Sequence, residues 1–170
     1  MATENIVLVG FMGAGKSTVA AELVRHSNFC LVDLDADIER KAGMSIREIF
    51  RQKGESAFRD LESLALQELC GQERLVVATG GGVLGRPQNR ELIRTIGRVV
   101  YLRATFTTLQ RRLNHSSERP LVKEQPDWNA LEALLLSRSP FYETADLIID
   151  TNNKNPKEIA TEILQRLAEV

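Results

Sequence analysis

The 170-residue sequence is poor in aromatic side chains, cysteine and histidine. Aromatic residues make up 5% of the chain, which argues against a surface on which nucleic-acid bases stack. The two cysteines, Cys30 and Cys70, form no C-x-x-C pair and have no histidine at a ligand spacing, so they indicate buried or idle thiols. His26 and His115 have no acid or nucleophile beside them at a recognisable spacing, and we assign neither a catalytic role.

The chain also lacks an excess of charge and a long apolar run. Its 22 basic and 23 acidic residues give a net charge of -1, so its overall field would hold neither nucleic acid nor an anionic membrane. The apolar stretch at residues 6–15 is too short to span a bilayer, and residues 1–5 lack the basic opening of a secretory signal. We therefore expect a cytoplasmic protein in which any anion site is local.

The length and composition fit one globular domain that covers residues 1–170. Hydrophobic residues make up 43% and charged residues 26%, and no segment rich in proline, glycine or serine divides the chain. Five short runs of consecutive apolar, often branched residues are typical of strands that are buried on both faces. These runs cover residues 6–9, 30–32, 75–78, 99–102 and 147–149.

Signals for helices separate these apolar runs. Ser45 and Glu48 have the spacing of a capping box, and Asn155, Pro156 and Glu158 follow the order of a helix start. The alternation predicts an α/β fold of three layers, with a mostly parallel five-stranded sheet between helices. In such folds, ligands bind at the carboxyl ends of the strands.

A polar segment from Asn114 to Asp127 interrupts the alternation. It contains Pro120 and Pro126 and lies between two helical patterns. Loops of this length are uncommon in compact domains and are usually functional or disordered. We interpret the segment as a mobile lid, with a variable surface excursion as the alternative.

Residues 10–17, with the sequence GFMGAGKS, match the phosphate-binding pattern G-x-x-x-x-G-K-[ST]. The match follows an apolar run and opens a helix, which makes an accidental glycine-rich turn a poor explanation. The glycines let backbone N–H groups face phosphate oxygens, and the helix N-terminus adds partial positive charge. We expect Lys16 to reach the β- and γ-phosphates of a nucleotide and Ser17 to bind magnesium.

Three aspartates, Asp33, Asp35 and Asp37, follow the second apolar run at alternate positions. In an extended segment they would point the same way and repel one another, an arrangement that suits a cation or a proton transfer. We assign Asp33 to a water-mediated hold on magnesium and Asp35 to an acceptor hydroxyl. Asp37 fits the first turn of a helix over residues 38–42. Three acids on a solvated turn is the alternative.

Gly80, Gly81 and Gly82 end the third apolar run, where something approaches the backbone too closely for a Cβ. A substrate is one explanation, and a tight turn without a ligand is the other. Because a guanidinium group captures carboxylate or phosphate in a bidentate manner, arginines are candidates for an anionic substrate. These candidates are Arg59, Arg119 and Arg138.

Five motifs, taken in order, resemble the shikimate kinase family from residue 6 to about residue 156. They are GFMGAGKST at 10–18, DLDADIE at 33–39, GESAFR at 54–59, TGGG at 79–82, and RPL at 119–121 with RSPFY at 138–142. The resemblance implies a P-loop NTPase fold of the nucleoside monophosphate kinase type, acting as a monomer. It also implies a substrate-binding region at about 34–62, a lid at about 113–127, and transfer of the γ-phosphate of ATP to the 3-hydroxyl of shikimate on the route to chorismate and aromatic amino acids.

The resemblance further implies roles for individual residues, with ATP and Mg²⁺ as cofactors. Asp35 would deprotonate the attacking hydroxyl, and Lys16 and Arg119 would act on the phosphates. The implied nucleotide-binding residues are Gly13, Ala14, Gly15, Lys16, Ser17, Thr18, Arg112 (with Arg111 as competitor), Arg119 and Pro156, and the metal-binding residues are Ser17 and Asp33. The implied substrate-binding residues are Asp35, Phe58, Arg59, Gly80, Gly81, Gly82 and Arg138, with Glu62 lining or bracing the site.

Two other functions stay open on the sequence alone. A different small-molecule kinase of the same architecture, such as a gluconate kinase or a nucleoside monophosphate kinase, would differ only in its acceptor. A nucleotide-binding regulatory module that has lost catalysis is the rival from another class. The presence of Lys16, Asp35 and Arg119 argues against this second rival.

Overall fold

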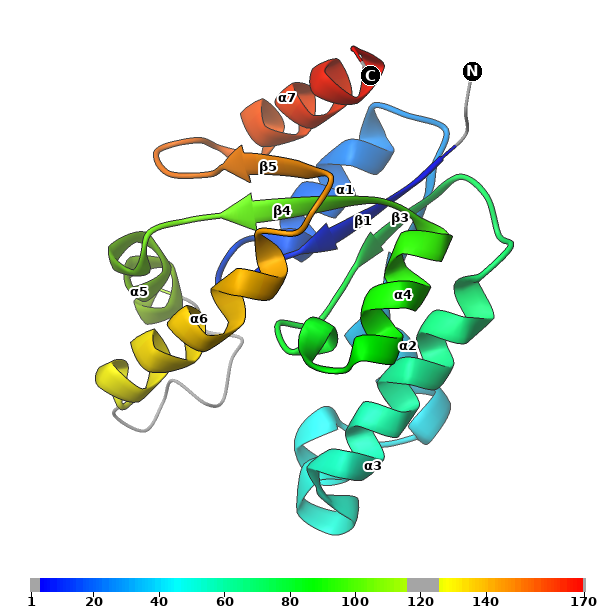
Figure 1. Ribbon diagram of the computed structural model, residues 1–170, viewed down its shortest axis with the longest axis vertical. Helices are drawn as coiled ribbons and strands as arrows, with labels where there is room; N and C mark the ends of the chain where they lie inside the picture. Colours follow the sequence, from blue (N-terminus) through cyan, green and yellow to red (C-terminus); the bar gives the residue numbers. More distant parts are fainter. Residues whose placement is uncertain (1–3, 116–125, 170) are drawn as a thin grey trace.

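The computed structural model describes residues 4–115 and 126–169, in which strands and helices alternate along the chain (Figure 1). The strands are β1 (Asn5–Val9), β2 (Cys30–Asp33), β3 (Leu75–Ala78), β4 (Gly97–Arg103) and β5 (Leu147–Asp150). The helices are α1 (Lys16–Arg25), α2 (Leu34–Ala42), α3 (Ile46–Leu69), α4 (Pro87–Ile96), α5 (Phe106–Asn114), α6 (Trp128–Tyr142) and α7 (Pro156–Ala168), with a 3₁₀ turn η1 (Val83–Gly85). All five predicted strands are confirmed. Within these two ranges, no helix is both long and apolar enough to cross a membrane.

The five strands form one parallel sheet in the order β2-β3-β1-β4-β5. From β1 the chain moves to the β2 edge, whereas from β3 it moves past β1 to β4 in the opposite direction. Because such crossovers are right-handed, the connecting helices α1 and α4 lie on opposite faces of the sheet. Helix α7 packs beside α1, and α3 lies beside α4 (Figure 1). The predicted three-layer α/β/α fold is therefore confirmed.

The central strands are buried on both faces, as their apolar runs predict. Val7, Leu8 and Val77 are each 0% exposed. The same prediction is wrong for β2, where Cys30 and Leu31 are exposed. The reason is that β2 is the edge strand, and the covering helices leave its first half open. The sequence left Cys30 as either a buried or an idle thiol, and its exposure rules out the buried one.

Helix α3 carries several predicted site residues, and its path depends on one glycine. The predicted capping box is present at its start, because Ser45 Oγ accepts a hydrogen bond from the N–H of Glu48 and the Glu48 carboxylate accepts one from the N–H of Ser45. Gly54 interrupts the helix with a left-handed φ of +85°, a conformation that glycine adopts without steric cost. The part of α3 after Gly54 thereby takes its own direction toward the end of β3.

The start of β4 passes so close to β1 that position 97 has no room for a side chain. A Cβ built on Gly97 would lie 2.1 Å from the carbonyl oxygen of Asn5. We expect Gly97→Ala to lower the free energy of unfolding by about 1–3 kcal/mol, the scale of overpacking, in urea denaturation. Gly85→Ala is the matched control, because a Cβ built there meets nothing within 4 Å. A Gly97→Ala protein as stable as this control would contradict the close approach.

Candidate active site

The loop between β1 and α1 wraps around the side chain of Lys16. Nζ of Lys16 donates hydrogen bonds to the carbonyl oxygens of Gly10, at 2.6 Å, and Phe11, at 3.0 Å, and the residue is 7% exposed. Gly13 and Gly15 have left-handed φ values of +82° and +90°, which allow the tight turn. A phosphate-binding loop is therefore formed at the N-terminus of α1, with an ammonium group held inside the turn.

Ser17 and Asp33 lie next to each other at this loop. Oγ of Ser17, in the first turn of α1, donates a hydrogen bond to Oδ2 of Asp33 at the end of β2, 2.9 Å away. Residues 4–115 and 126–169 contain no group of three or more His, Cys, Asp or Glu side chains that could hold a metal. One hydroxyl and one carboxylate suit Mg²⁺, which nucleotide-binding sites hold through few protein oxygens together with phosphates and water.

The prediction that the three aspartates lie in an extended segment is wrong. Strand β2 ends at Asp33 and α2 begins at Leu34, because Oδ1 of Asp33 accepts a hydrogen bond from the N–H of Ala36 and caps the helix. Asp35 and Asp37 are therefore helical. Residues two positions apart on a helix point to nearly opposite sides, so the two carboxylates separate instead of sharing a face.

Asp37 belongs to a surface ion-pair cluster. Its carboxylate pairs with Arg40 and Lys41 one turn further along α2. Its assignment to the first turn of a helix is therefore confirmed, although that helix begins at Leu34 and not at residue 38.

Asp35 and Glu62 both face Gly80, the first residue of the glycine triplet (residues 80–82). A Cβ built on Gly80 would lie 3.0 Å from Oδ1 of Asp35 and 3.3 Å from Oε2 of Glu62. Burial raises the pKa of the Glu62 carboxyl, against the opposing effect of the Arg59 guanidinium, and the nearby Asp35 raises it further. Glu62 is completely buried and Asp35 is half-buried. Only Asp35 is therefore placed where a ligand hydroxyl could reach it.

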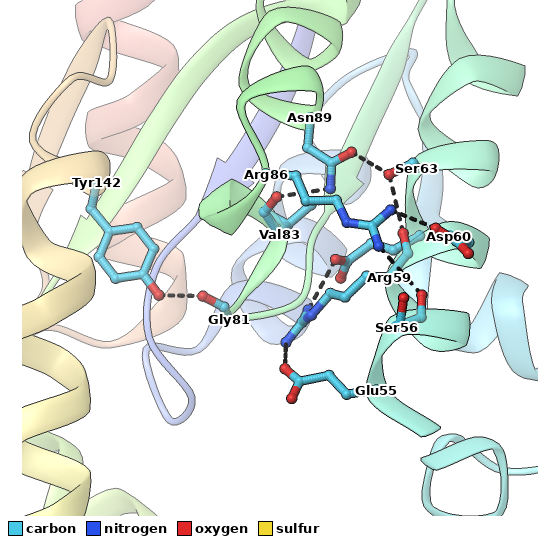
Figure 2. Close-up of polar contacts among 11 residues, drawn as sticks. Glu55, Ser56, Arg59, Asp60, Ser63, Gly81, Val83, Arg86, Asn89 and Tyr142 are labelled. Carbon is cyan, nitrogen blue, oxygen red and sulfur yellow. Dashed lines mark hydrogen bonds and ion pairs between the residues drawn. The ribbon is translucent and has the colours of Figure 1, made fainter. Parts of the chain in front are cut away.

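The guanidinium of Arg59 lies against the backbone of Gly82. A Cβ built on Gly82 would lie 2.4 Å from Nη2 of Arg59, closer than real contacts allow. Nη1 of Arg59 donates to Oε1 of Glu62 at 2.9 Å, and Nη2 lies 3.4 Å from Oε1 of the exposed Glu55 (Figure 2). The buried Glu62 thus holds Nη1 of the guanidinium, while Nη2 lies beside Gly82 and an exposed carboxylate that an anionic ligand could replace.

Phe58 braces Arg59. Its side chain is 4% exposed, and its ring centroid lies 5.2 Å from Cζ of Arg59 and 5.0 Å from the ring of Phe50. An arginine stacked on a buried aromatic ring has less freedom to change rotamer. The contact therefore helps to keep the guanidinium beside the glycine triplet.

Arg138, on α6, approaches the triplet from the other side. A Cβ built on Gly81 would lie 3.4 Å from Nη1 of Arg138. The guanidinium also lies over the ring of Phe11, with Cζ 5.8 Å from the ring centroid. At each glycine of the triplet, a charged side chain of the protein itself lies near the backbone, most closely at Gly82. That a ligand also approaches the triplet stays a prediction.

The glycine triplet also lies against the phosphate-binding loop. The same Cβ on Gly81 would be 3.4 Å from the backbone N of Met12 and 3.8 Å from the carbonyl oxygen of Gly10. The groups predicted to bind a nucleotide and those predicted to bind an acceptor therefore lie close together at Gly81.

Arg112, on α5, reaches the phosphate-binding loop from the β5 side. Its guanidinium donates to Oγ1 of Thr151 at 3.1 Å and to the carbonyl oxygen of Thr151 at 2.8 Å, and it lies 3.5 Å from the carbonyl oxygen of Gly13. Burial lowers the pKa of Arg112, and the adjacent Arg111 lowers it further. Arg111 itself is exposed. Of the two candidates, Arg112 is the one held next to the loop.

Two sequence predictions are left partly or wholly without structural information. Arg119 lies outside the described residues, as do residues 116–125 of the predicted lid. The sequence also gave no signal for Asn89, a 0% exposed polar side chain that bonds to Val83 and Ser63 beside the triplet. Tyr142 is also buried, and its hydroxyl donates a hydrogen bond to the carbonyl oxygen of Gly81.

Comparisons with known proteins agree with this geometry. A model of the shikimate kinase family matches residues 12–168. The shikimate kinase of Geobacter sulfurreducens is 47% identical over 159 residues, which cover 94% of this chain and 88% of that one. That of Pseudomonas syringae pv. syringae is 42% identical over 167 residues, covering 98% and 97%. The solved structure of shikimate kinase from Acinetobacter baumannii in complex with shikimate has a TM-score of 0.90 at 39% identity, covering 98% of this chain and 93% of that one.

The buried Glu62 carboxyl predicts a pH dependence of stability. Its pKa in the folded state is raised above the ordinary 4.5, so on raising the pH the unfolded chain loses this proton first. Stability therefore falls as the pH rises from 4.5 through the raised pKa of Glu62. Glu62→Gln should remove this slope in urea denaturation at several pH values. Glu55→Gln, whose carboxylate is exposed, should keep it. Equal slopes for wild type and Glu62→Gln would contradict the prediction.

Proposed function

The chain belongs to the shikimate kinase family, and from that premise we propose how its residues transfer the γ-phosphate of ATP to the 3-hydroxyl of shikimate. One observation carries the proposal: the glycine triplet lies close to the phosphate-binding loop and also faces Asp35, Arg59 and Arg138. A triphosphate in the loop and a small acid at the triplet would therefore be neighbours. Phosphoryl transfer depends on that alignment together with electrostatic stabilisation of the developing charge.

On the nucleotide side, the backbone amide groups of residues 13–18 surround the phosphates. Lys16 exchanges the two carbonyl oxygens that it now bonds for oxygens of the β- and γ-phosphates. Ser17 and, through water, Asp33 would hold Mg²⁺, which would supply positive charge against the charge that develops on the phosphoryl group. Arg112 and Pro156, at the start of α7, enclose the adenine.

On the acceptor side, Asp35 orients the 3-hydroxyl and takes its proton. Arg59 and Arg138 bind the carboxylate from two directions, and the backbone of the glycine triplet contacts the ring hydroxyls. A bidentate guanidinium pair favours a planar carboxylate over a neutral sugar. This preference supports shikimate over a neutral acceptor.

Further parts of the proposal rest on chemistry and not on described contacts. Arg119 would neutralise the charge on the transferring phosphate and exclude water as a rival acceptor, and this role stays a prediction. We also propose that the protein acts as a monomer, because one chain supplies all the described groups of the site. Its place in the cytoplasm, where ATP is available, is part of the same proposal.

A coupled assay of ADP release tests the choice of acceptor. The purified protein is offered ATP and Mg²⁺ with shikimate, with gluconate, or with nucleoside monophosphates. We expect turnover with shikimate alone, because only a carboxylate-bearing ring can use both arginines and Asp35. Turnover with gluconate and none with shikimate would overturn the proposal. Tight ATP binding without turnover on any acceptor would favour a regulatory module.

Asp35→Asn tests the proposed base. We expect turnover to fall by roughly a hundredfold or more, the scale for loss of a general base, while the KM for ATP stays nearly unchanged. Asp37→Asn is the matched control, since Asp37 lies on the same helix but pairs with Arg40 and Lys41 at the surface. The control should keep turnover within about twofold of wild type. An Asp35→Asn enzyme with wild-type turnover would remove Asp35 from the mechanism.

A further inference from the structure

Two buried side chains hold the backbone on either side of Gly82. The hydroxyl of Tyr142 donates a hydrogen bond to the carbonyl oxygen of Gly81, and Nδ2 of Asn89 donates one to the carbonyl oxygen of Val83, 3.0 Å away (Figure 2). Tyr142 is 1% exposed and Asn89 is 0% exposed. Glycines have no side chains with which to anchor a loop, so these two carbonyl groups are the points at which packed helices hold the triplet.

The Asn89 contact connects the triplet to the turn of α3 that carries Arg59. Oδ1 of Asn89 accepts a hydrogen bond from Oγ of Ser63, at 2.6 Å, and this Oγ lies 3.1 Å from the carbonyl oxygen of Arg59. The bond to Val83 on one side of the amide and the bond from Ser63 on the other fix its orientation. Asn89 is thus a buried bridge between the end of the triplet and the helical turn that begins with Arg59.

A second contact between α4 and α3 supports this bridge. Arg86, next to the start of α4, donates to Oδ1 of Asp60 at 2.7 Å and to the carbonyl oxygen of Ser56 at 3.3 Å (Figure 2). Both acceptors belong to the stretch of α3 that surrounds Arg59. The position of this stretch relative to η1 is therefore fixed by polar contacts from α4 at two points.

The Tyr142 contact connects the triplet to the turn of α6 that carries Arg138. The two residues are four positions apart on one helix, so they lie on the same face. The Tyr142 ring stacks on Tyr101 of β4, with ring centroids 5.0 Å apart. Burial raises the pKa of the phenol to about 12, so the hydroxyl keeps its proton and acts as a donor. The ring packing and the hydrogen bond together place α6 against Gly81.

We propose that Asn89 and Tyr142 are positioning residues that set the distance between Arg59 and Arg138 across the glycine triplet, and thereby the affinity for the acceptor carboxylate. The inference rests on the proposed role of both arginines. Each residue ties the backbone beside Gly82 to the helical turn of one arginine. Loss of either bond would let one guanidinium move relative to the other. Such a movement weakens the binding of a carboxylate that both guanidinium groups contact at the same time.

Four variants test this proposal against a merely structural role. Asn89→Ala and Tyr142→Phe remove the two bonds. Asn5→Ala is the matched control for Asn89, because Asn5 is also buried and bridges Gln72, Leu75 and Ile96 at the amino ends of the strands, away from the site. Tyr101→Phe is the control for Tyr142, because it removes the hydroxyl of the ring that stacks on Tyr142. Melting temperature and the KM values for shikimate and for ATP are measured for each.

We expect Asn89→Ala and Tyr142→Phe to raise the KM for shikimate about tenfold or more, as for loss of a group that orients a ligand-binding side chain. The KM for ATP should stay within about twofold of wild type. Asn5→Ala should lower the melting temperature as Asn89→Ala does, yet both controls should keep the wild-type KM for shikimate. If Asn89→Ala fails to fold, Tyr142→Phe, which keeps the ring, decides the matter.

The proposal is overturned if Tyr142→Phe keeps the wild-type KM for shikimate, or if Asn89→Ala and Asn5→Ala change it equally. Arg138→Lys separates this failure from failure of the acceptor assignment. A point charge cannot reproduce the guanidinium fork, so this variant should raise the KM for shikimate and not that for ATP. If Arg138→Lys has the expected effect while the positioning variants do not, only the positioning role falls. If Arg138→Lys also leaves the KM for shikimate unchanged, the assignment of the arginine falls with it.

Discussion

The parallel pairing of β1 with β3 is the constraint on which the site depends. The pairing matches Leu8 with Ala78, and Thr79 extends it by one residue, since both its N–H and its hydroxyl donate to the carbonyl oxygen of Leu8. The two strands separate into two glycine-rich loops directly after this point. One loop surrounds Lys16, and the other is the glycine triplet. The distance between the nucleotide and acceptor sides is therefore set by hydrogen bonds of the sheet and not by mobile side chains.

Glu62 lies between one opposite and one like charge at the triplet. Burial and the nearby Asp35 carboxylate raise its pKa, whereas the Arg59 guanidinium pairs with it and lowers the pKa. In the proposed function, an incoming carboxylate would meet Arg59 with one edge of the guanidinium paired with Glu62 and the other turned toward the solvent-exposed Glu55. Charge pairing of this kind favours one orientation of the incoming acid, because only that edge can form a new bidentate contact.

The sequence predicted the strands, the phosphate-binding loop and the importance of the glycine triplet, because these depend on local patterns. Apolar runs mark buried strands, and glycine marks backbone without room for a Cβ. The prediction that Asp33, Asp35 and Asp37 lie in an extended segment was wrong, because Asp33 caps a helix that begins at the next residue. Asn89 carried no local signal at all. Its partners Ser63 and Val83 lie 26 and 6 residues away, and only the packing of α3 against α4 brings Ser63 to it.

The helices on the two faces of the sheet supply residues to different proposed ligand sites. Helices α1 and α7, which pack together on one face, supply Lys16, Ser17 and Pro156 to the proposed nucleotide site. Helices α3 and α6 supply Arg59 and Arg138, and α4, on the opposite face from α1, holds α3 against the glycine triplet. The two sets of groups meet where the loops after β1 and β3 lie close together and where the Arg138 guanidinium lies over Phe11. Away from this meeting point, the contacts of Asn89 and Arg86 with α3 act on the turn that carries Arg59, while Lys16 and Ser17 are held by hydrogen bonds of their own.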